Sequence, residues 1–297
     1  MPFTTLAFGL GVIINVIFFY LLLINRHLSD KTINKSILFN LAITLCDGLI
    51  CLEFLINLMD KWMFYEGFVG KLMCILFYND SAFYFLMSCR SGLTLLMCLY
   101  HFIKLLYPFL VNSVYFTFVV SSGFVLLLGN SILIPFIIIR RTLIYGYEYE
   151  LTYCLLEPFN YEGTQFLINI VFFTYSFLMP GIGTVFFYAH ILKSINSIET
   201  ISREKAFVEL RKSFLIDSLL FIICYLHFSL KLLSYCFSVS FEKENHLDIR
   251  DSSSITIGMY SMSYALFSMI FKSSHRRWIR RQFLIKIALE HISGTVR

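Results

Sequence analysis

The sequence has few charged residues. Asp, Glu, Lys and Arg make up 14% of its 297 residues, whereas a soluble domain carries about 25%. Such a chain cannot build a water-facing surface, which excludes soluble enzymes, coiled coils, repeat solenoids and disordered proteins. Hydrophobic residues make up 58% of the sequence and aromatic residues 18%. This composition predicts a multi-pass membrane protein.

The sequence also lacks the short motifs that carry catalytic or cofactor chemistry. It has no HExxH pair, no Gly-rich phosphate-binding loop, no CxxC pair and no Ser-His-Asp grouping near a membrane face. We therefore expect no enzyme activity, no cofactor and no metal site.

Long apolar runs are present instead, separated by charged and turn residues. A helical span needs about 20 apolar residues, and a transmembrane strand about 10 of alternating polarity. The runs are too long and continuous for strands. We therefore predict an all-α integral membrane protein, a bundle of seven transmembrane helices forming one domain over residues 1–297. The predicted spans are 6–24, 36–59, 72–103, 114–139, 166–192, 214–240 and 254–271. Residues 274–289 alternate basic with apolar side chains and predict an amphipathic helix on the membrane surface.

The Lys and Arg residues predict the orientation. With the amino terminus outside, sixteen of them fall in cytosolic segments and six in outer segments, and Arg90 and Lys231 lie within spans. Cytosolic segments of membrane proteins are enriched in these residues. We therefore expect a plasma-membrane protein with an outer amino terminus and a cytosolic carboxyl terminus. The basic face needs no nucleic acid to explain it, because anionic lipid and acidic cytosolic partners suffice.

Two of the eight cysteines lie outside the apolar interior of the predicted spans. Cys74 opens the third span from the outer side, and Cys154 lies in the outer loop after the fourth span. Both would face an oxidising compartment, where a disulfide persists. A Cys74–Cys154 bridge would stabilise the protein by roughly 3 kcal/mol in the chain-entropy model. The alternative is two free thiols.

Several residues, in this order and spacing, resemble the marks of the rhodopsin-like G-protein-coupled receptors. They are Asn15 in the first span, Asn40-Leu41-Ala42 in the second, Trp62-Met63-Phe64 in the first outer loop, Pro135 in the fourth span, Pro180 and Tyr188 in the fifth, Phe221 to Tyr225 in the sixth, and Trp278 and Phe283 after the seventh. The resemblance covers nearly the whole chain. It implies a receptor that binds an extracellular ligand within the bundle and signals to heterotrimeric G proteins.

The chain departs from this family at positions used for signalling. The Asp-Arg-Tyr motif falls on Cys98-Leu99-Tyr100, and Asn-Pro-x-x-Tyr falls on residues 267–271 without its Asn, Pro or Tyr. The resemblance still implies that Leu99, Tyr100 and Tyr188 face the G protein. The sodium-site aspartate position reads Leu45, which would place Asp47 around the other side of its helix.

Charges within the spans predict a ligand site, because ionisable groups in a membrane usually face the bundle interior. We expect Asp80 and Lys231 to flank a pocket with apolar walls and few polar groups. The remaining predicted lining residues are Ser81, Tyr84, Phe85, Phe172, Ser176, Tyr225 and Phe228. The alternative is that both charges reach the membrane interface and the aromatic side chains only pack.

Two further polar residues receive structural expectations. We expect Arg90, near the middle of the third span, to point toward spans four and five in a structural role. His227 stands where the family has a sixth-span proline, and we expect it to be buried and hydrogen-bonded or to respond to pH.

Two other classes remain as alternatives to a signalling receptor. A receptor-like protein could act without G proteins, by dimerising with another receptor or by trapping ligand, and the sequence does not distinguish a chemosensory from a virus-encoded origin. A transporter is less favoured, because transporters are usually built from paired repeats and the chain shows no internal similarity. The expected partners are an unidentified extracellular ligand, a heterotrimeric G protein, membrane lipid and a second receptor copy.

Overall fold

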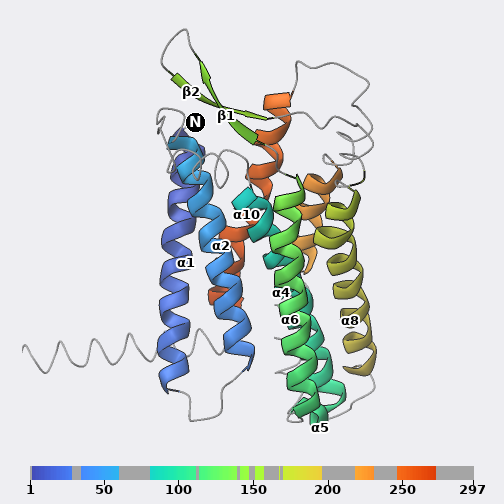
Figure 1. Ribbon diagram of the computed structural model, residues 1–297. Coiled ribbons are helices and arrows are strands. Elements are labelled where there is room, and N and C mark those ends of the chain that lie inside the picture. Colours follow the sequence, from blue (N-terminus) through green and yellow to red (C-terminus); the bar gives the residue numbers. More distant parts are fainter. Residues whose placement is uncertain are drawn as a thin grey trace, which may run out of the picture.

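The computed structural model describes residues 2–28, 35–59, 81–111, 114–138, 141–146, 151–156, 167, 170–195, 218–230 and 246–271 (Figure 1). The described part consists of helices packed side by side, with one small β-hairpin. The elements are α1 (Pro2–Leu28), α2 (Lys35–Met59), α4 (Ser81–Leu106), α5 (Pro108–Val111), α6 (Val114–Ile138), β1 (Arg141–Gly146), β2 (Leu151–Leu156), the π-helix η3 (Thr174–Leu178), α8 (Met179–Ile195), the Ser218–Leu230 helix and α10 (His246–Phe271). Each predicted span is helical where it is described. The predicted amphipathic helix at 274–289 lies outside the described residues.

Among the described residues, four helices are long and apolar enough to cross a membrane, judged by length and composition. Their apolar segments are Thr5–Ile24, Ser36–Ile56, Ala82–Leu106 and Ile170–Ser194. At about 1.5 Å per residue, 20 residues already span the roughly 30 Å of a bilayer core. Two shorter apolar segments are Phe116–Gly129 and Ser218–Leu230. These helices are those of a protein built to lie within a membrane.

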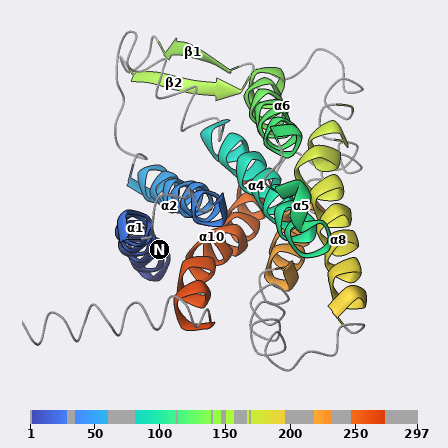
Figure 2. The same ribbon diagram turned by 90° about the horizontal axis from the view of Figure 1, so that it is seen from below.

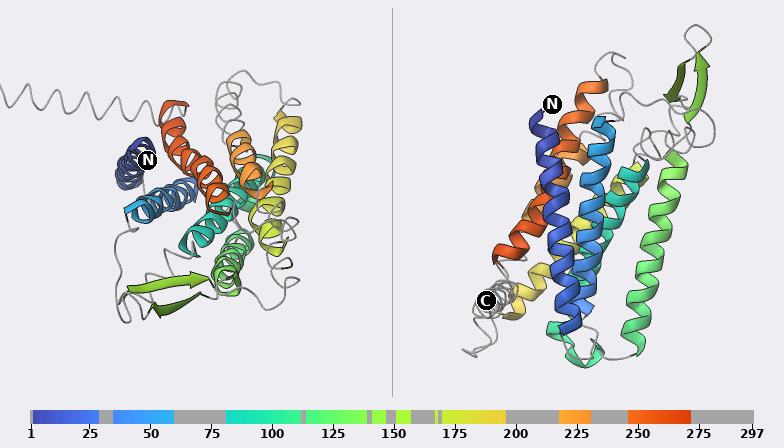
Figure 3. Two further views of the ribbon diagram at one scale, coloured as in Figure 1. Left: turned by 90° about the horizontal axis from the view of Figure 1, so that it is seen from above. Right: turned by 90° about the vertical axis from the view of Figure 1, so that its left-hand side faces the viewer.

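Helix α4 runs through the middle of the bundle. It contacts α2 on one side and α6, η3 and α8 on the others (Figure 2). Helix α10 packs against α1 and α2, so the last described helix lies next to the first. The right-hand view of Figure 3 shows α1 and α10 both beginning at the end of the bundle that carries the hairpin and running away from that end.

Glycine lets α4 and α6 approach closely. A Cβ atom on Gly92 would lie 3.1 Å from two methyl groups of Leu127, which is tighter than an ordinary contact. On the opposite side of the bundle, a Cβ on Gly11 would lie 2.8 Å from the sulfur of Cys51 in α2. Small residues of this kind allow helix backbones to pack closely in membranes.

Most of the described bundle core falls into two hydrophobic clusters along α4, beside a small third cluster of Cys98 and Tyr188. The aromatic cluster consists of Ile50, Phe83, Met87, Phe172, Phe177, Phe221, Tyr225, Phe228, Ile257 and Tyr260. The mixed cluster consists of Phe18, Leu22, Phe39, Leu41, Ile43, Leu93, Leu96, Met97, Tyr100, Phe116, Tyr264 and Ala265. The α4 residues of the aromatic cluster precede Arg90 in the chain, and those of the mixed cluster follow it.

The hairpin adds an element that the sequence reading did not assign. Strands β1 and β2 pair antiparallel, with Arg141 opposite Leu156 and Leu143 opposite Cys154. Their threonine, isoleucine and tyrosine residues favour strands. Cys74 lies outside the described residues, so the predicted Cys74–Cys154 disulfide stays a prediction.

Candidate functional site

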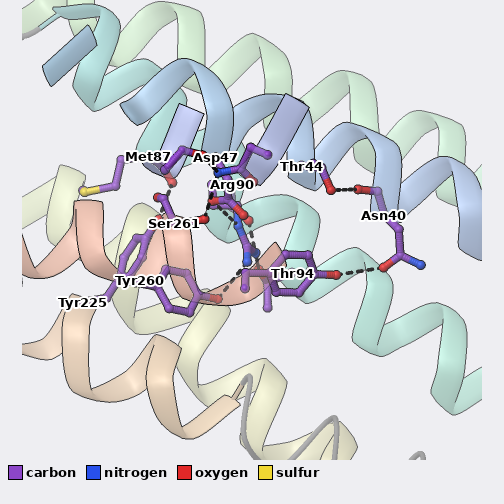
Figure 4. Close-up of polar contacts among 12 residues, drawn as sticks. Asn40, Thr44, Asp47, Met87, Arg90, Thr94, Tyr225, Tyr260 and Ser261 are labelled. Carbon is purple, nitrogen blue, oxygen red and sulfur yellow. Dashed lines mark hydrogen bonds and ion pairs between the residues drawn. The ribbon is translucent and has the colours of Figure 1, made fainter. Parts of the chain in front are cut away.

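A cluster of polar side chains lies between the two hydrophobic clusters. At its centre Arg90 is completely buried, with 0% of its surface exposed. Its Nε donates to Oδ1 of Asp47 at 2.9 Å, and its Nη2 donates to the Tyr260 hydroxyl at 2.9 Å (Figure 4). Its Nη1 donates to the Thr94 hydroxyl, one turn further along α4. We call these four residues the polar cluster; they join α4 to α2 and to α10.

The expectation for Arg90 was wrong, whereas Asp47 does lie on the other side of α2 from Leu45, as expected. Asp47 is completely buried and Leu45 is 50% exposed, so Asp47 lies on the face of α2 that meets the bundle and the family's sodium-site position does not. Two residues along a helix correspond to about 200° of rotation, which exchanges an inward for an outward position. Arg90 points toward α2 and α10 rather than toward spans four and five. Its attraction to the buried Asp47 carboxylate explains this direction.

The pair is electrically neutral as a unit. An isolated charge within a bilayer or a dry protein interior is costly, and an ion pair offsets that cost only when hydrogen bonds satisfy the remaining polar atoms. All three guanidinium nitrogens of Arg90 donate a hydrogen bond. Removing either charge would therefore leave the other buried without compensation.

Two tyrosines of α10 flank the guanidinium. The central carbon of Arg90 lies 4.9 Å from the ring centre of Tyr260 and 4.6 Å from that of Tyr264. Residues four apart lie on one face of a helix, so α10 presents both rings to α4. A cation over an aromatic ring is attracted by the ring quadrupole. The Tyr264 hydroxyl donates to Oδ1 of Asn40 at 2.8 Å, which ties α10 to α2 a second time.

Asn15 extends the polar contacts to α1. Its Nδ2 donates to the Gly11 carbonyl at 2.9 Å within α1 and to the Ser261 carbonyl at 3.3 Å in α10. Asn15 and Ser261 are both buried. Helices α1, α2, α4 and α10 are thus connected by polar contacts among buried residues.

The structure brings together five of the residues predicted to line a ligand site. Tyr84 packs edge-on against Phe172 at 5.1 Å and contacts Phe228 at 6.1 Å between ring centres. Tyr225 is completely buried in the same cluster. The fifth residue, Ser176, hydrogen-bonds the hydroxyl of Ser88 at 2.5 Å.

The remaining predicted lining residues are placed differently or not described. Phe85 is half-buried and does not belong to the aromatic cluster. Asp80 and Lys231 lie outside the described residues. For Ser81, the first residue of α4, only the backbone is described. The expectation that two charges flank the aromatic residues stays a prediction.

A π-helical turn presents Ser176 and Phe177 to the bundle interior. In η3 the amide of Met179 donates to the carbonyl of Thr174, five residues earlier, and Ser176 and Phe177 are buried. Short π-helical turns within helices frequently occur at functional sites. The turn ends two residues before Pro180, and its Ser176 contacts α4 through Ser88.

The residues predicted to face a G protein lie in the later part of α4 and in α8. Tyr100 is buried in the mixed cluster, 5.7 Å from the ring of Phe39. Tyr188 is buried against Cys98, and Leu99 is half-buried. Their predicted role in signalling is not tested by this placement.

His227 does not lie where the sequence predicted. It is exposed, as are Ile223, Leu226 and Leu230 on the same helix, and it therefore lies outside the aromatic cluster. The expectation of a buried, hydrogen-bonded His227 was wrong, because in an apolar helix the sequence alone does not reveal which face packs inward.

The Asp47–Arg90 pair is the feature that sequence reasoning missed. The available signal was the presence of two opposite charges near the middle of the second and third predicted spans, which neighbour each other in the chain. In the part of the chain that the structure describes, no group of three or more His, Cys, Asp or Glu residues could hold a metal ion.

No protein-family model matches the sequence, and no curated protein matches it. The function is therefore inferred from the residues and their arrangement.

Proposed function

We propose that the chain is a seven-helix receptor of the rhodopsin-like type, which binds an extracellular ligand within its bundle and signals to heterotrimeric G proteins. The observation that carries the proposal is the central position of α4. Its first half packs in the aromatic cluster, its middle carries Arg90, and its second half packs in the mixed cluster. A change among the aromatic side chains at one end would thus act directly on the helix that reaches the other end.

The order of the helices supports the same proposal. Helices α1, α2 and α10 pack together, α4 lies between α2 and α8, and α6 lies beside α4. In this proposal the amino terminus is extracellular and the carboxyl terminus cytosolic at the plasma membrane, as the distribution of Lys and Arg predicts. The hairpin end of the bundle is then the extracellular end.

The ligand would act on the aromatic cluster. Apolar walls with a few polar groups are the usual form of a small-ligand site. Tyr84, Phe172 and Phe228 supply the walls, and Ser88 and Ser176 supply two hydroxyls that already bond each other. Asp80 and Lys231 would add charge to the entrance.

A receptor-like protein without G-protein coupling is the second candidate. The observation that favours it is Leu99, because an apolar side chain stands where the family engages its G protein through arginine. Such a protein would act through dimerisation or ligand capture at the membrane.

Basal G-protein activation separates the two candidates. The full-length chain is expressed in cells and nucleotide exchange is measured for each G-protein class, with the Leu99→Arg variant and a surface-expression control. The receptor proposal predicts basal exchange above that of cells without the protein, and a further rise with Leu99→Arg. Absence of exchange in both chains at normal surface expression would favour the second candidate.

A further inference from the structure

Tyr260 belongs to both the polar cluster and the aromatic cluster. Its hydroxyl accepts the hydrogen bond from Nη2 of Arg90 at 2.9 Å. Its ring packs edge-on against Tyr225, with the ring centres 5.7 Å apart and the planes at 87°. It also meets Phe221 edge-on at 6.2 Å. One side chain of α10 therefore contacts the Ser218–Leu230 helix and the buried charge of α4.

The aromatic contacts continue from Tyr260 toward the proposed ligand site. The ring centres of Phe221 and Tyr225 lie 4.5 Å apart, and the Phe221 ring stacks on that of Phe177 in η3 with 6.5 Å between the ring centres. The Tyr225 hydroxyl lies 3.5 Å from the carbonyl of Met87, one turn before Arg90. A rearrangement of these rings would change the position of the Tyr260 ring, because packed side chains do not move independently.

The position of the Tyr260 hydroxyl affects the hydrogen bonds of Arg90. The guanidinium is planar and its donors have fixed directions. When the Tyr260 hydroxyl moves, Nη2 loses its acceptor, and the geometry of the Nε bond to Asp47 changes with it. A buried ion pair is stable only with good hydrogen-bond geometry. We therefore expect the Asp47–Arg90 pair to switch to a different set of hydrogen bonds when the Tyr260 hydroxyl moves, rather than to distort gradually.

We propose that Tyr260 is a positioning residue that couples the packing of the aromatic cluster to the Asp47–Arg90 ion pair through its hydroxyl. The Ser218–Leu230 helix also meets α2 through Ile50 and α4 through Met87 in the aromatic cluster. Tyr260 is the member of that cluster whose hydroxyl bonds the ion pair itself. The inference rests on the proposed receptor function, since a ligand at the aromatic cluster would start the change.

Tyr264 supplies a matched control. It lies one turn along the same helix and its ring also flanks Arg90, but its hydroxyl bonds Asn40 and its ring belongs to the mixed cluster. Tyr260→Phe and Tyr264→Phe each remove one hydroxyl from α10 and keep the ring. If the bond to Arg90 carries the coupling, Tyr260→Phe should remove it and Tyr264→Phe should leave it in place.

A double-mutant cycle tests the coupling by thermal unfolding of the purified full chain in detergent. Phe221→Leu and Asp47→Asn are made singly and together. Distant, independent sites give additive effects. We expect the shift in Tm of the double variant to differ from the sum of the single shifts by about 2 °C or more. The difference should vanish in a Tyr260→Phe background and persist with Tyr264→Phe. Additive shifts in the natural chain, or a difference that survives Tyr260→Phe, would overturn the proposal.

A distance measurement provides a readout that loss of stability alone would not move. Spin labels are attached through genetically encoded ketone residues at Ile223 and Leu45, which are 62% and 50% exposed, so that the native cysteines remain. Double electron–electron resonance then gives the distribution of distances between the two labels, and so between the Ser218–Leu230 helix and α2. We expect Tyr260→Phe and Asp47→Asn to shift the distribution in the same direction, and Tyr264→Phe to leave it as in the natural chain. A distribution unchanged by Tyr260→Phe would contradict the inference.

The two proposals fail separately. Coupling in both experiments with no G-protein activation by any chain would remove the signalling function and keep the role of Tyr260. Activation by the natural chain with additive shifts and an unchanged distribution would keep the receptor and remove the role of Tyr260.

Discussion

The mixed cluster and the aromatic cluster hold different helices together in different ways. The mixed cluster joins α1, α2, α4, α6 and α10 through aliphatic side chains interspersed with rings, and the Tyr264 hydroxyl hydrogen-bonds Asn40 and the sulfur of Met97. The aromatic cluster joins α2, through Ile50, to α4, α10, η3 and the Ser218–Leu230 helix, and its rings meet mostly at their edges. Aliphatic side chains that fill space leave few alternative arrangements, whereas edge contacts between rings can be exchanged for other edge or offset contacts at small cost. If the chain is the receptor proposed above, the mixed cluster would serve as the scaffold and the aromatic cluster would respond to ligand.

The largest loss of stability is expected from a change in the polar cluster, which lies between the two hydrophobic clusters. Arg90→Met removes the positive charge and leaves the Asp47 carboxylate buried. We expect a loss of about 3 to 5 kcal/mol of stability, because one member of a buried pair is then uncompensated. Thermal unfolding of the purified protein measures it. A loss below about 1 kcal/mol would mean that the pair is solvated or not formed.

A smaller loss is expected from truncation in the mixed cluster. Leu93 is buried on α4, and Leu93→Ala would leave a cavity costing about 2 to 5 kcal/mol. Because this cluster is assigned to the scaffold, basal G-protein exchange per surface molecule should stay the same. A change of exchange at matched surface expression would break the distinction between the clusters.

A substitution in the aromatic cluster should have a small effect on stability and a large effect on basal G-protein exchange, the reverse of Leu93→Ala. Phe228→Leu keeps an apolar side chain but removes the ring that contacts Phe83 and Tyr84. We expect about 1 kcal/mol of lost stability together with a clear change in basal exchange. Basal exchange of Phe228→Leu is measured beside that of Leu93→Ala at equal surface expression. An exchange rate equal to that of the natural chain would show that these rings only pack.

The smallest effect is expected outside both clusters. His227 is exposed beside apolar residues of the Ser218–Leu230 helix. His227→Leu should change stability by no more than about 0.5 kcal/mol and leave the pH dependence of basal exchange as it is. A pH profile that moves with this variant would restore the pH-sensitive role that the sequence suggested.

Much of the fold could be predicted from the sequence, because long apolar runs locate helices without knowledge of their packing. The aromatic residues Tyr84, Phe172, Tyr225 and Phe228 could also be grouped, since their depths along the predicted spans agree. Rotation of the helices could not be predicted. Lipid tails and the bundle core are both apolar, so Leu45 facing outward and Leu41 facing inward look alike in sequence. For this reason the sequence could not show that Asp47 rather than Leu45 meets the bundle, and the buried position expected for His227 was wrong.

The most direct test of the account is a double-mutant cycle on the central ion pair. Arg90→Met, Asp47→Leu and the two together are compared by thermal unfolding of the purified full chain. If the charges lie against each other in the core, the double variant should be more stable than Arg90→Met alone, because no uncompensated charge remains. A double variant whose loss equals the sum of the two single losses would show that Arg90 and Asp47 do not pair, and the link between the clusters would be lost with them.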